Sequence, residues 1–201
     1  MIRRLPIIPT LVVALAVALL VALGVWQLHR AKEKELLLAR YAAAQKLPPI
    51  TFPTVPLRND QLPLFRYATG LCVRPVGRRA TAGENRDGEP GFAHIVDCAT
   101  GAEGPGMSVE VGWSKDPNAK FNWPGGLVSG IIVPDHVARM RLVAASAPPG
   151  HEPSKTPDVS TASPITPAGH RGYAATWFAL AVVAAAVYAV AVRKHLEAPK
   201  P

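Results

Sequence analysis

The stretch IIPTLVVALAVALLVALGV, residues 7–25, decides the fold class because it contains no Asp, Glu, Lys, Arg or His. A second such stretch, GYAATWFALAVVAAAVYAVAV, occupies residues 172–192. Each has close to the ~20 apolar residues that cross a ~30 Å hydrocarbon core as a helix. Trp26, Tyr173 and Trp177 near their ends suit the aromatic belt of a membrane interface. We therefore predict a membrane protein with two transmembrane helices that flank a small, mainly antiparallel β (α+β) extracytoplasmic domain.

Each apolar stretch has an alternative interpretation. Arg3 and Arg4 before the first stretch also suit a secretory signal peptide, but residues 25–29 lack the small-x-small pattern of a cleavage site. The second stretch could be a buried helix of a soluble protein, but Ala and Val cover all its faces and residues 193–195 (RKH) follow it. We therefore prefer two uncleaved transmembrane helices.

Two spans place both ends of the chain on the same side of the membrane. Arg3, Arg4, Arg193 and Lys194 favour the cytoplasm for these ends. Basic residues at 30–34 oppose this orientation, but a loop much longer than ~60 residues largely escapes the charge rule. The central domain is then predicted to lie outside, which is the periplasm in a Gram-negative bacterium. The net charge of +8 includes no basic run interleaved with aromatic residues, which argues against nucleic-acid binding.

Prolines and turn residues divide the chain into segments. Strong helix formers continue the first helix as far as Pro48 and Pro49, which end it. Short apolar or alternating runs separated by turn-rich pieces indicate strands at 64–76, 91–99, 107–113, 127–133 and 137–144. Residues 148–167 hold six prolines and little to bury, so we expect an extended linker or a poorly ordered loop there.

The predicted segments follow the chain in order. They are a cytoplasmic N-terminus (1–6), transmembrane helix 1 (7–28), a juxtamembrane helix (29–46), a periplasmic β-rich domain (47–146), a Pro-rich linker (147–168), transmembrane helix 2 (169–192) and a cytoplasmic tail (193–201).

Cys72 and Cys98 are the only cysteines, and both lie in the predicted outer domain. An even count in an oxidising compartment favours a disulfide between them. Free buried thiols and a copper or redox site are the alternatives, although the pair forms no CxxC motif.

The sequence contains none of the common catalytic signatures, such as GxSxG, HExxH or a Gly-rich phosphate loop followed by Lys. His94, His136 and His151 lie in strand or loop context, where we expect ordinary surface or packed residues. We therefore predict no catalytic residues and no enzyme. A periplasmic enzyme whose site residues are distant in sequence stays an alternative.

Candidate binding residues gather where the two predicted helices cross the outer interface. They are Trp26, His29 and Arg30 on one face of the first helix, and His170, Tyr173 and Trp177 on one face of the second. Antiparallel helices bring both faces to the same leaflet. Haem would use an imidazole on its iron, aromatic rings against the macrocycle, and Arg30 or Arg171 against its propionates. The same residue types are also common interfacial anchors without any ligand, and this interpretation stays open.

Two sequence motifs at these crossings resemble a known family. Residues 24–32, GVWQLHRAK, with Leu36 and Leu37 following, resemble the G-x-W-Q-x-x-R-x-x-x-K segment of the surfeit-locus-one family. Residues 169–181, GHRGYAATWFALA, resemble its N-H-x-x-Y-A-x-x-W-F-x-L-A pattern. Between them, VEVGW at 109–113 resembles a family strand that ends in Gly-Trp, and GII at 130–132 sits where a Gly-containing strand follows.

The chain departs from the family pattern at two places. Glu110 and Val111 stand before Gly-Trp, where the family usually has an Arg, and Ala168 and Gly169 stand before the histidine in place of an Asn pair. The second departure removes side chains that could orient the imidazole. The middle of the chain, roughly 46–165, matches only weakly.

The resemblance implies an assembly factor for cytochrome c oxidase at the bacterial inner (cytoplasmic) membrane. It implies a chaperone of respiratory chain biogenesis that transiently binds haem a and assists its delivery or insertion into subunit I. His170 matches the family's proposed ligand of haem iron, and Trp26, Arg30, Tyr173 and Trp177 match other motif positions of the cofactor-binding site.

The implied partners are subunit I, other assembly factors and the lipid bilayer, without nucleic acid, and a homo-oligomer stays open. The alternative function is a membrane scaffold that contacts oxidase subunits and binds no haem.

Overall fold

The computed structural model describes residues 6–101, 106–163 and 165–197. Arg3 and Arg4, on which the predicted topology partly rests, lie outside these residues, as does the end of the predicted tail. The chain divides into two compact units. One unit is Met1–Leu37 with Ser163–Pro201, and the other is Leu38–Ala162.

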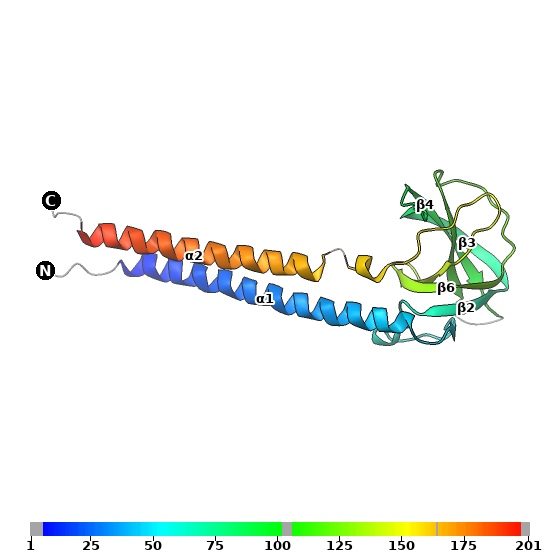
Figure 1. Ribbon diagram of the computed structural model, residues 1–201, viewed down its shortest axis with the longest axis horizontal. Helices are drawn as coiled ribbons and strands as arrows, with labels where there is room; N and C mark the ends of the chain where they lie inside the picture. The colour runs from blue at the N-terminus through cyan, green and yellow to red at the C-terminus, as the bar shows by residue number, and fades with distance from the viewer. Residues whose placement is uncertain (1–5, 102–105, 164, 198–201) are drawn as a thin grey trace. The chain divides into compact units, whose positions relative to one another are not determined.

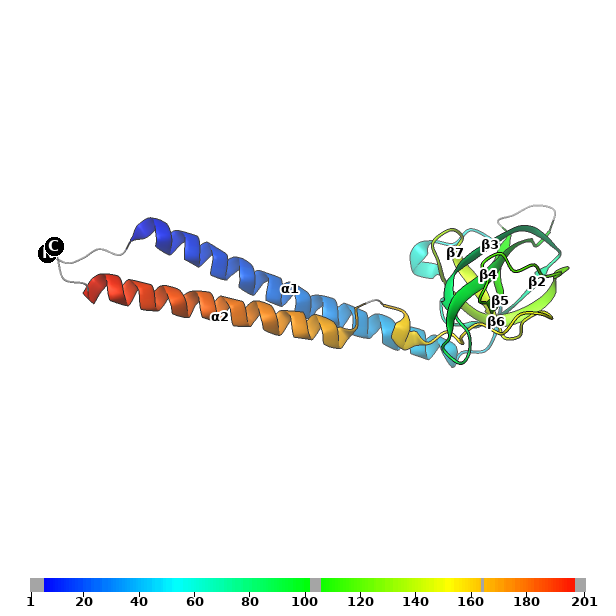
Figure 2. The same ribbon diagram turned by 90° about the horizontal axis from the view of Figure 1, so that it is seen from above.

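The first unit is a pair of long helices, α1 (Ile7–Gln45) and α2 (Pro167–Glu197). Figures 1 and 2 show them running side by side in opposite directions. At 39 and 31 residues they extend for about 58 and 46 Å, more than a ~30 Å hydrocarbon core requires. Only 6% of the most apolar 18-residue stretch of each helix is buried against the rest of the protein. Neither helix is therefore the core helix of a soluble fold.

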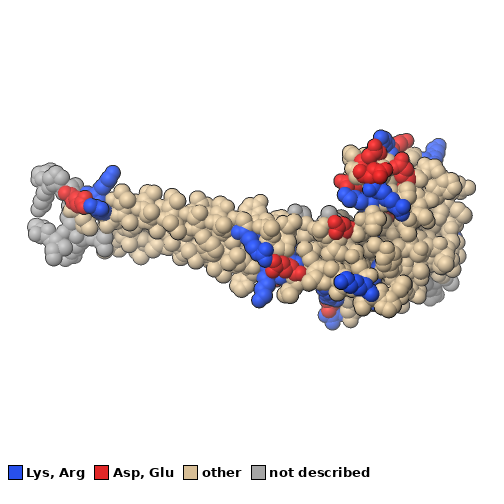
Figure 3. Space-filling view, in the orientation of Figure 1, with Lys and Arg blue, Asp and Glu red and all other residues tan. Residues whose placement is uncertain are grey.

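The surface of the helix pair is divided by charge. Figure 3 shows a long stretch without Lys, Arg, Asp or Glu on the visible face, bounded at both ends by charged side chains. Exposed apolar residues such as Leu15, Leu19 and Val183 cover this stretch. A surface of this kind is stable against lipid tails, because burial of apolar side chains away from water is favourable. Both helices are thus long and apolar enough to cross a membrane.

Local sequence sets where the helices end. At the end of α1 the amides of Lys46 and Leu47 donate to the carbonyls three residues before them. Pro48 follows, and it has no amide proton to continue the helix. Helix α2 opens with Pro167, whose missing N–H costs nothing in a first turn. The hydroxyl of Thr166 caps α2 by accepting from the amide of Gly169 at 3.1 Å.

The second unit contains one seven-stranded sheet. Its strands are β1 (Ile50–Thr51), β2 (Tyr67–Cys72), β3 (Arg74–Glu84), β4 (Pro90–Ala99), β5 (Met107–Ser114), β6 (Gly126–Asp135) and β7 (Arg139–Ala144). They lie in the order β1-β2-β6-β7-β5-β4-β3. The β1–β2 and β5–β7 pairs are parallel and the other pairs are antiparallel. The prediction of two long apolar helices that flank a mainly antiparallel sheet in the sequence is therefore confirmed.

One predicted strand is wrong. The run at 64–76 is not continuous, because β2 ends at Cys72 and the chain turns at Val73 into β3. Strand β3 then continues to Glu84 through Arg78 and Arg79, where no strand was predicted. It lies at the edge of the sheet, and its side chains alternate between exposed and half-buried. An edge strand of this kind needs few apolar residues, so an apolar run does not mark it.

The core of the sheet unit occupies both faces of strand β6. Ile132 belongs to the main core cluster, whereas its neighbours Ile131 and Val133 form a second cluster with Val143. Alternate residues of a strand point to opposite faces, so β6 is covered on both. The largest fully buried side chains of the unit include Trp113, Ile95, Ile132, Leu142, Val96 and Val109.

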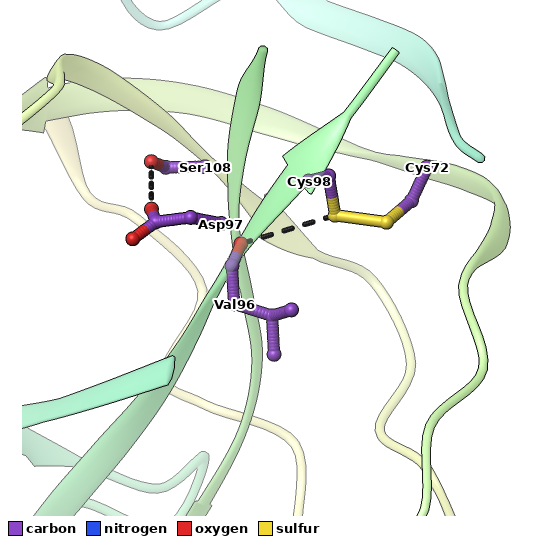
Figure 4. Close-up of a disulfide and its surroundings, with 5 residues drawn as sticks. All are labelled: Cys72, Val96, Asp97, Cys98 and Ser108. Atoms are coloured by element: carbon purple, nitrogen blue, oxygen red, sulfur yellow. Dashed lines mark hydrogen bonds between the residues drawn. A yellow bond between two sulfur atoms is a disulfide. The ribbon is translucent and has the colours of Figure 1, made fainter. Parts of the chain in front are cut away.

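A disulfide joins Cys72 at the end of β2 to Cys98 in β4. Both residues belong to the main core cluster and are almost fully buried. Figure 4 shows that the side chain of the neighbouring Asp97 points to the other face of β4, where the hydroxyl of Ser108 donates to it at 2.5 Å. The disulfide therefore fixes β2 to β4, which are not neighbours in the sheet.

Residues 151–155, which lie in the predicted linker, pair with the sheet. Glu152 exchanges two main-chain hydrogen bonds with Trp113, and the amide of Lys155 donates to the carbonyl of Glu84 at 2.8 Å. The ring of His151 lies edge-on against the rings of His94 and Phe121, with centroids 4.7 and 4.5 Å away. Part of the linker is thus an ordered layer on the sheet, held by main-chain bonds that its composition does not reveal.

Replacing both Cys72 and Cys98 with Ala should lower the free energy of unfolding of the sheet unit by about 3–4 kcal/mol. This estimate follows from the entropy of the loop that the disulfide closes over a sequence separation of 26. Denaturant unfolding of the purified chain in detergent, with and without reductant, measures it. An unfolding midpoint that neither the substitutions nor the reductant lowers would contradict the prediction.

The packed imidazoles of His94 and His151 should make the sheet unit less stable in mild acid. Burial and the neighbouring His151 lower the pKa of His94 against the opposing influence of Asp116, and burial lowers the pKa of His151 against that of the Gly150 main chain. In the unfolded chain both side chains have a pKa of about 6.5. The unfolded state therefore binds more protons below that pH, and stability is lost as pH falls from about 7 to 5.

The variant His151→Leu should flatten this pH dependence, because it removes one of the two titratable rings whose pKa burial lowers. His136→Leu is the matched control, since His136 is exposed on the same unit. Unfolding midpoints measured across this pH range for both variants provide the test. Equal slopes for His151→Leu, His136→Leu and the unsubstituted chain would contradict the assignment.

Candidate functional site

The helix pair buries one imidazole, that of His170. Its position near the start of α2 follows from the cap at Thr166, and its amide donates to the Thr166 carbonyl at 3.1 Å. Only 6% of the residue is exposed. Its Nδ1 atom lies 2.7 Å from the Oε1 atom of Gln27 on α1. A hydrogen bond between the two helices thus holds the ring.

The other residues of the predicted site lie around this pair with different exposures. Trp26 and Tyr173 are each 54% exposed, so their rings are open to a ligand or to lipid. Trp177 is half-buried. Arg30 forms an ion pair with Glu33 of its own helix at 2.6 Å. The structure therefore brings His170 into contact with Gln27, which was not a predicted site residue, and leaves the aromatic rings on the surface.

A second ion pair, next to His170 in sequence, joins the two helices. The guanidinium of Arg171 contacts the carboxylate of Glu35 across the pair. Both arginines that could face haem propionates, Arg30 and Arg171, therefore have carboxylate partners, and both pairs are about half exposed. Exposed ion pairs of this kind contribute little stability and exchange partners readily.

Small residues line the contact between the helices. Gly24 and Ala31 are the buried residues of α1, and Ala174 and Ala181 are buried with His170 on α2. A Cβ atom on Gly24 would lie 2.5 Å from the ring of Phe178. Small residues at these positions let two helix backbones approach closely, which is the usual basis of helix association in membranes.

Gln27 is the residue of this contact that sequence reasoning missed. It lies in the quoted Trp-Gln motif, next to Trp26 in sequence, but it was not chosen as a site residue. Its helical spacing from Gly24 and Ala31, three and four residues away, was the available signal. These two buried small residues mark the face of α1 that contacts α2.

The sheet unit has an open groove of about 790 Å³ with a charged floor. Asp135 bonds to Arg79 at 2.8 Å and to Arg141 at 3.1 Å, and Arg141 also bonds to Glu110 at 2.7 Å. Burial raises the pKa of Asp135, but the Ala138 amide and Arg79 outweigh it and hold the pKa below its usual range. In this network two carboxylates and two guanidinium groups neutralise one another. Such an arrangement is typical of a structural network.

A Ser–His contact in the sheet unit is not arranged for nucleophilic catalysis. The Nε2 atom of His94 lies 2.7 Å from the hydroxyl of Ser114, and this hydroxyl donates to the Asp116 carbonyl at 2.7 Å. The hydroxyl proton is thus already directed away from the ring, so Nε2 donates and cannot act as the base that such catalysis needs. Among the described residues, no group of three or more His, Cys, Asp or Glu could hold a metal ion.

Two apolar helices flank a mainly antiparallel sheet in the sequence, and a hydrogen-bonded histidine lies between the helices. These features define a two-span membrane protein with a folded central domain. A comparison with protein families matches residues 14–182 to the SURF1 family. This range covers most of the chain, and the chain therefore belongs to the SURF1 family. A search of curated proteins found no match.

The resemblance seen in the two motifs is thereby confirmed. The SURF1 family is associated with cytochrome c oxidase assembly, and its members are assembly factors rather than enzymes. The chain is accordingly a membrane-bound member of a family of oxidase assembly factors.

The packing of Gly24 against Phe178 gives a test of the helix contact. Gly24→Ala should destabilise the pair by about 1–3 kcal/mol, because the added methyl group overpacks the contact. The effect should shrink when Phe178 is replaced by Ala, since the two sites are coupled. Thermal unfolding in detergent compares Gly24→Ala, Phe178→Ala and the double variant with the unsubstituted chain.

Gly172→Ala is the matched control, because nothing lies within 4 Å of a Cβ atom at Gly172. It should leave the unfolding temperature unchanged or raise it slightly, as Ala favours a helix more than Gly. Equal effects of Gly24→Ala and Gly172→Ala would contradict the close packing of the helices at Gly24.

Proposed function

We propose that this protein assists the delivery of haem a to subunit I of cytochrome c oxidase, or its insertion there, with His170 as the transient ligand of the haem iron. The buried, hydrogen-bonded imidazole of His170 carries this proposal. A ring held in this way on its Nδ1 side offers Nε2 as a ligand. Membership of a family associated with oxidase assembly supports the choice of cofactor.

The residues around His170 fit a haem. Trp26 and Tyr173 expose flat aromatic surface that suits the macrocycle. Arg30 and Arg171 can exchange their exposed carboxylate partners for propionates, which bind guanidinium groups strongly. When bound, the iron would supply a coordination site for imidazole. The residues of the chain bind and orient the group, and they carry out no chemical step on it.

We also propose in which membrane the protein lies and on which side of it the sheet unit is found. The protein would lie in a bacterial inner membrane with cytoplasmic termini and a periplasmic sheet unit. Two observations support this side for the sheet unit. The unit contains the buried disulfide Cys72–Cys98, which suits an oxidising compartment. Arg193 and Lys194 follow the second apolar stretch, as cytoplasmic ends of transmembrane helices do.

In a strain without the gene, the unsubstituted chain should restore the haem a content of the oxidase, and His170→Ala should not. His136→Ala is the matched control, because His136 is an exposed imidazole on the sheet unit. The haem content of purified oxidase and the membrane level of each variant are the two measurements. Full restoration by His170→Ala at normal membrane level would overturn the ligand role.

A scaffold that contacts oxidase subunits without haem is the competing function. The exposed rings of Trp26 and Tyr173 could contact a partner subunit instead of a macrocycle. Purification of the chain from cells that make haem a separates the two functions. A haem spectrum that disappears in His170→Ala supports delivery, and a crosslink from the Trp177 face to subunit I without any haem spectrum supports the scaffold.

A further inference from the structure

The imidazole of His170 makes its hydrogen bond to the opposite helix. The Nδ1 atom of His170 and the Oε1 atom of Gln27 lie 2.7 Å apart. An amide oxygen can only accept, so Nδ1 carries the proton of this bond. In a neutral ring the other nitrogen, Nε2, then holds a lone pair. The bond therefore selects the form of the ring in which Nε2 can bind a metal ion.

We propose that Gln27 is a positioning residue for His170: its side-chain oxygen selects the Nδ1–H form of the ring and fixes the direction of Nε2. This inference rests on the proposed function of His170 as a haem ligand. Gln27 acts through His170 and contacts no iron itself. Partners of this kind are general for metal-binding histidines, whose second nitrogen usually donates to a carboxylate, a carbonyl or water.

The orientation of the Gln27 amide decides which ring nitrogen of His170 carries the proton. With the oxygen toward Nδ1, as in the structure, Nε2 is free to bind. With the NH₂ group toward the ring, Nδ1 would have to accept, and Nε2 would carry the proton and could not bind a metal ion. A substitution that removes the oxygen therefore acts on the proton of the ring. It does so even where the helices stay packed.

Packing on both sides of Gln27 holds the oxygen in place. The buried Gly24 and Ala31 lie three residues before it and four residues after it on α1, and the buried Ala174 lies four residues after His170 on α2. These three small residues let the backbones approach. The ion pair between Arg171 and Glu35 adds a polar contact beside the ring. Gln27 therefore reaches the ring from a fixed register of the two helices.

The residues just before His170, Ala168 and Gly169, have no side chain that can accept a hydrogen bond. The acceptor for the ring lies on the other helix. The orientation of the ligand then depends on the contact between the helices.

The test compares three variants of the full chain purified in detergent. Gln27→Leu removes the acceptor at similar size, and Gln27→Glu keeps an oxygen acceptor at the same reach. Gln45→Leu makes the same change at the last residue of α1 and is the matched control. Thermal unfolding of each variant shows that it is folded.

The first readout needs no haem. Nitrogen-15 NMR of histidine-labelled protein distinguishes the Nδ1–H from the Nε2–H form, and His170→Ala identifies the resonance. The unsubstituted chain, Gln27→Glu and Gln45→Leu should show Nδ1–H at His170, and Gln27→Leu should show a shift toward Nε2–H. An unchanged Nδ1–H signal in folded Gln27→Leu would overturn the inference.

The second readout is titration with haem followed by absorbance and by the reduction potential of the complex. Gln27→Leu should bind about 10–100-fold more weakly, as is usual when the partner of a metal-binding histidine is lost. Gln27→Glu should restore most of the affinity and lower the potential, because a carboxylate pushes more electron density through the ring. Equal affinity and potential in Gln27→Leu and Gln45→Leu would overturn the inference.

The two readouts separate this inference from the proposed function. An unsubstituted chain that binds no haem overturns the ligand role of His170, while the NMR signal still decides whether Gln27 sets the form of the ring. Haem binding that is lost in His170→Ala but is unchanged in Gln27→Leu supports the ligand role and overturns the positioning role.

Discussion

The close approach of α1 and α2 is the constraint on which the arrangement around His170 depends. Lipid tails are as apolar as the helices, so burial of apolar surface cannot hold two such helices together in a membrane. Packing and polar contacts must do so. Gly24 and Ala174 leave room for the backbones to approach, and Phe178 fills the space above Gly24. At that separation the side chain of Gln27 reaches the ring of His170. The same geometry therefore pairs the helices and orients the imidazole.

The sheet unit, unlike the helix pair, is stabilised by an apolar core, a disulfide and ion pairs. Its apolar core is continuous across the antiparallel strands, and the disulfide Cys72–Cys98 fixes two strands that are not neighbours. Its charged floor pairs buried carboxylates with partly exposed arginines, and Asp135 bonds to two of these arginines. Removal of one partner from such a network leaves a buried charge without compensation, which destabilises a fold more strongly than loss of the pair as a whole. These contacts are structural, because each charged group of the floor is used in an ion pair with another.

The sequence predicted those features that depend on length and composition. The two apolar stretches are uninterrupted and of membrane length, so each apolar helix was predictable, and periodicity located most strands. Strand β3 was missed because an edge strand tolerates Arg78, Arg79 and Thr81 without an apolar pattern. The pairing of Glu152 with Trp113 was missed because main-chain hydrogen bonds leave no trace in composition. Gln27 was missed because its role depends on contact with a residue 143 positions away.

At both departures from the family pattern a nearby buried group finds its partner on another element. Glu110 and Val111 stand before Gly-Trp, where the family usually has an Arg, and Arg141 on the neighbouring β7 neutralises Glu110 at 2.7 Å. Ala168 and Gly169 stand before His170, and Gln27 on α1 accepts a hydrogen bond from the ring. A buried charge or a buried ring nitrogen needs a partner wherever it lies in the chain. Residues matched one by one to a motif therefore describe the site incompletely, because the requirement belongs to the buried atom and not to the sequence position.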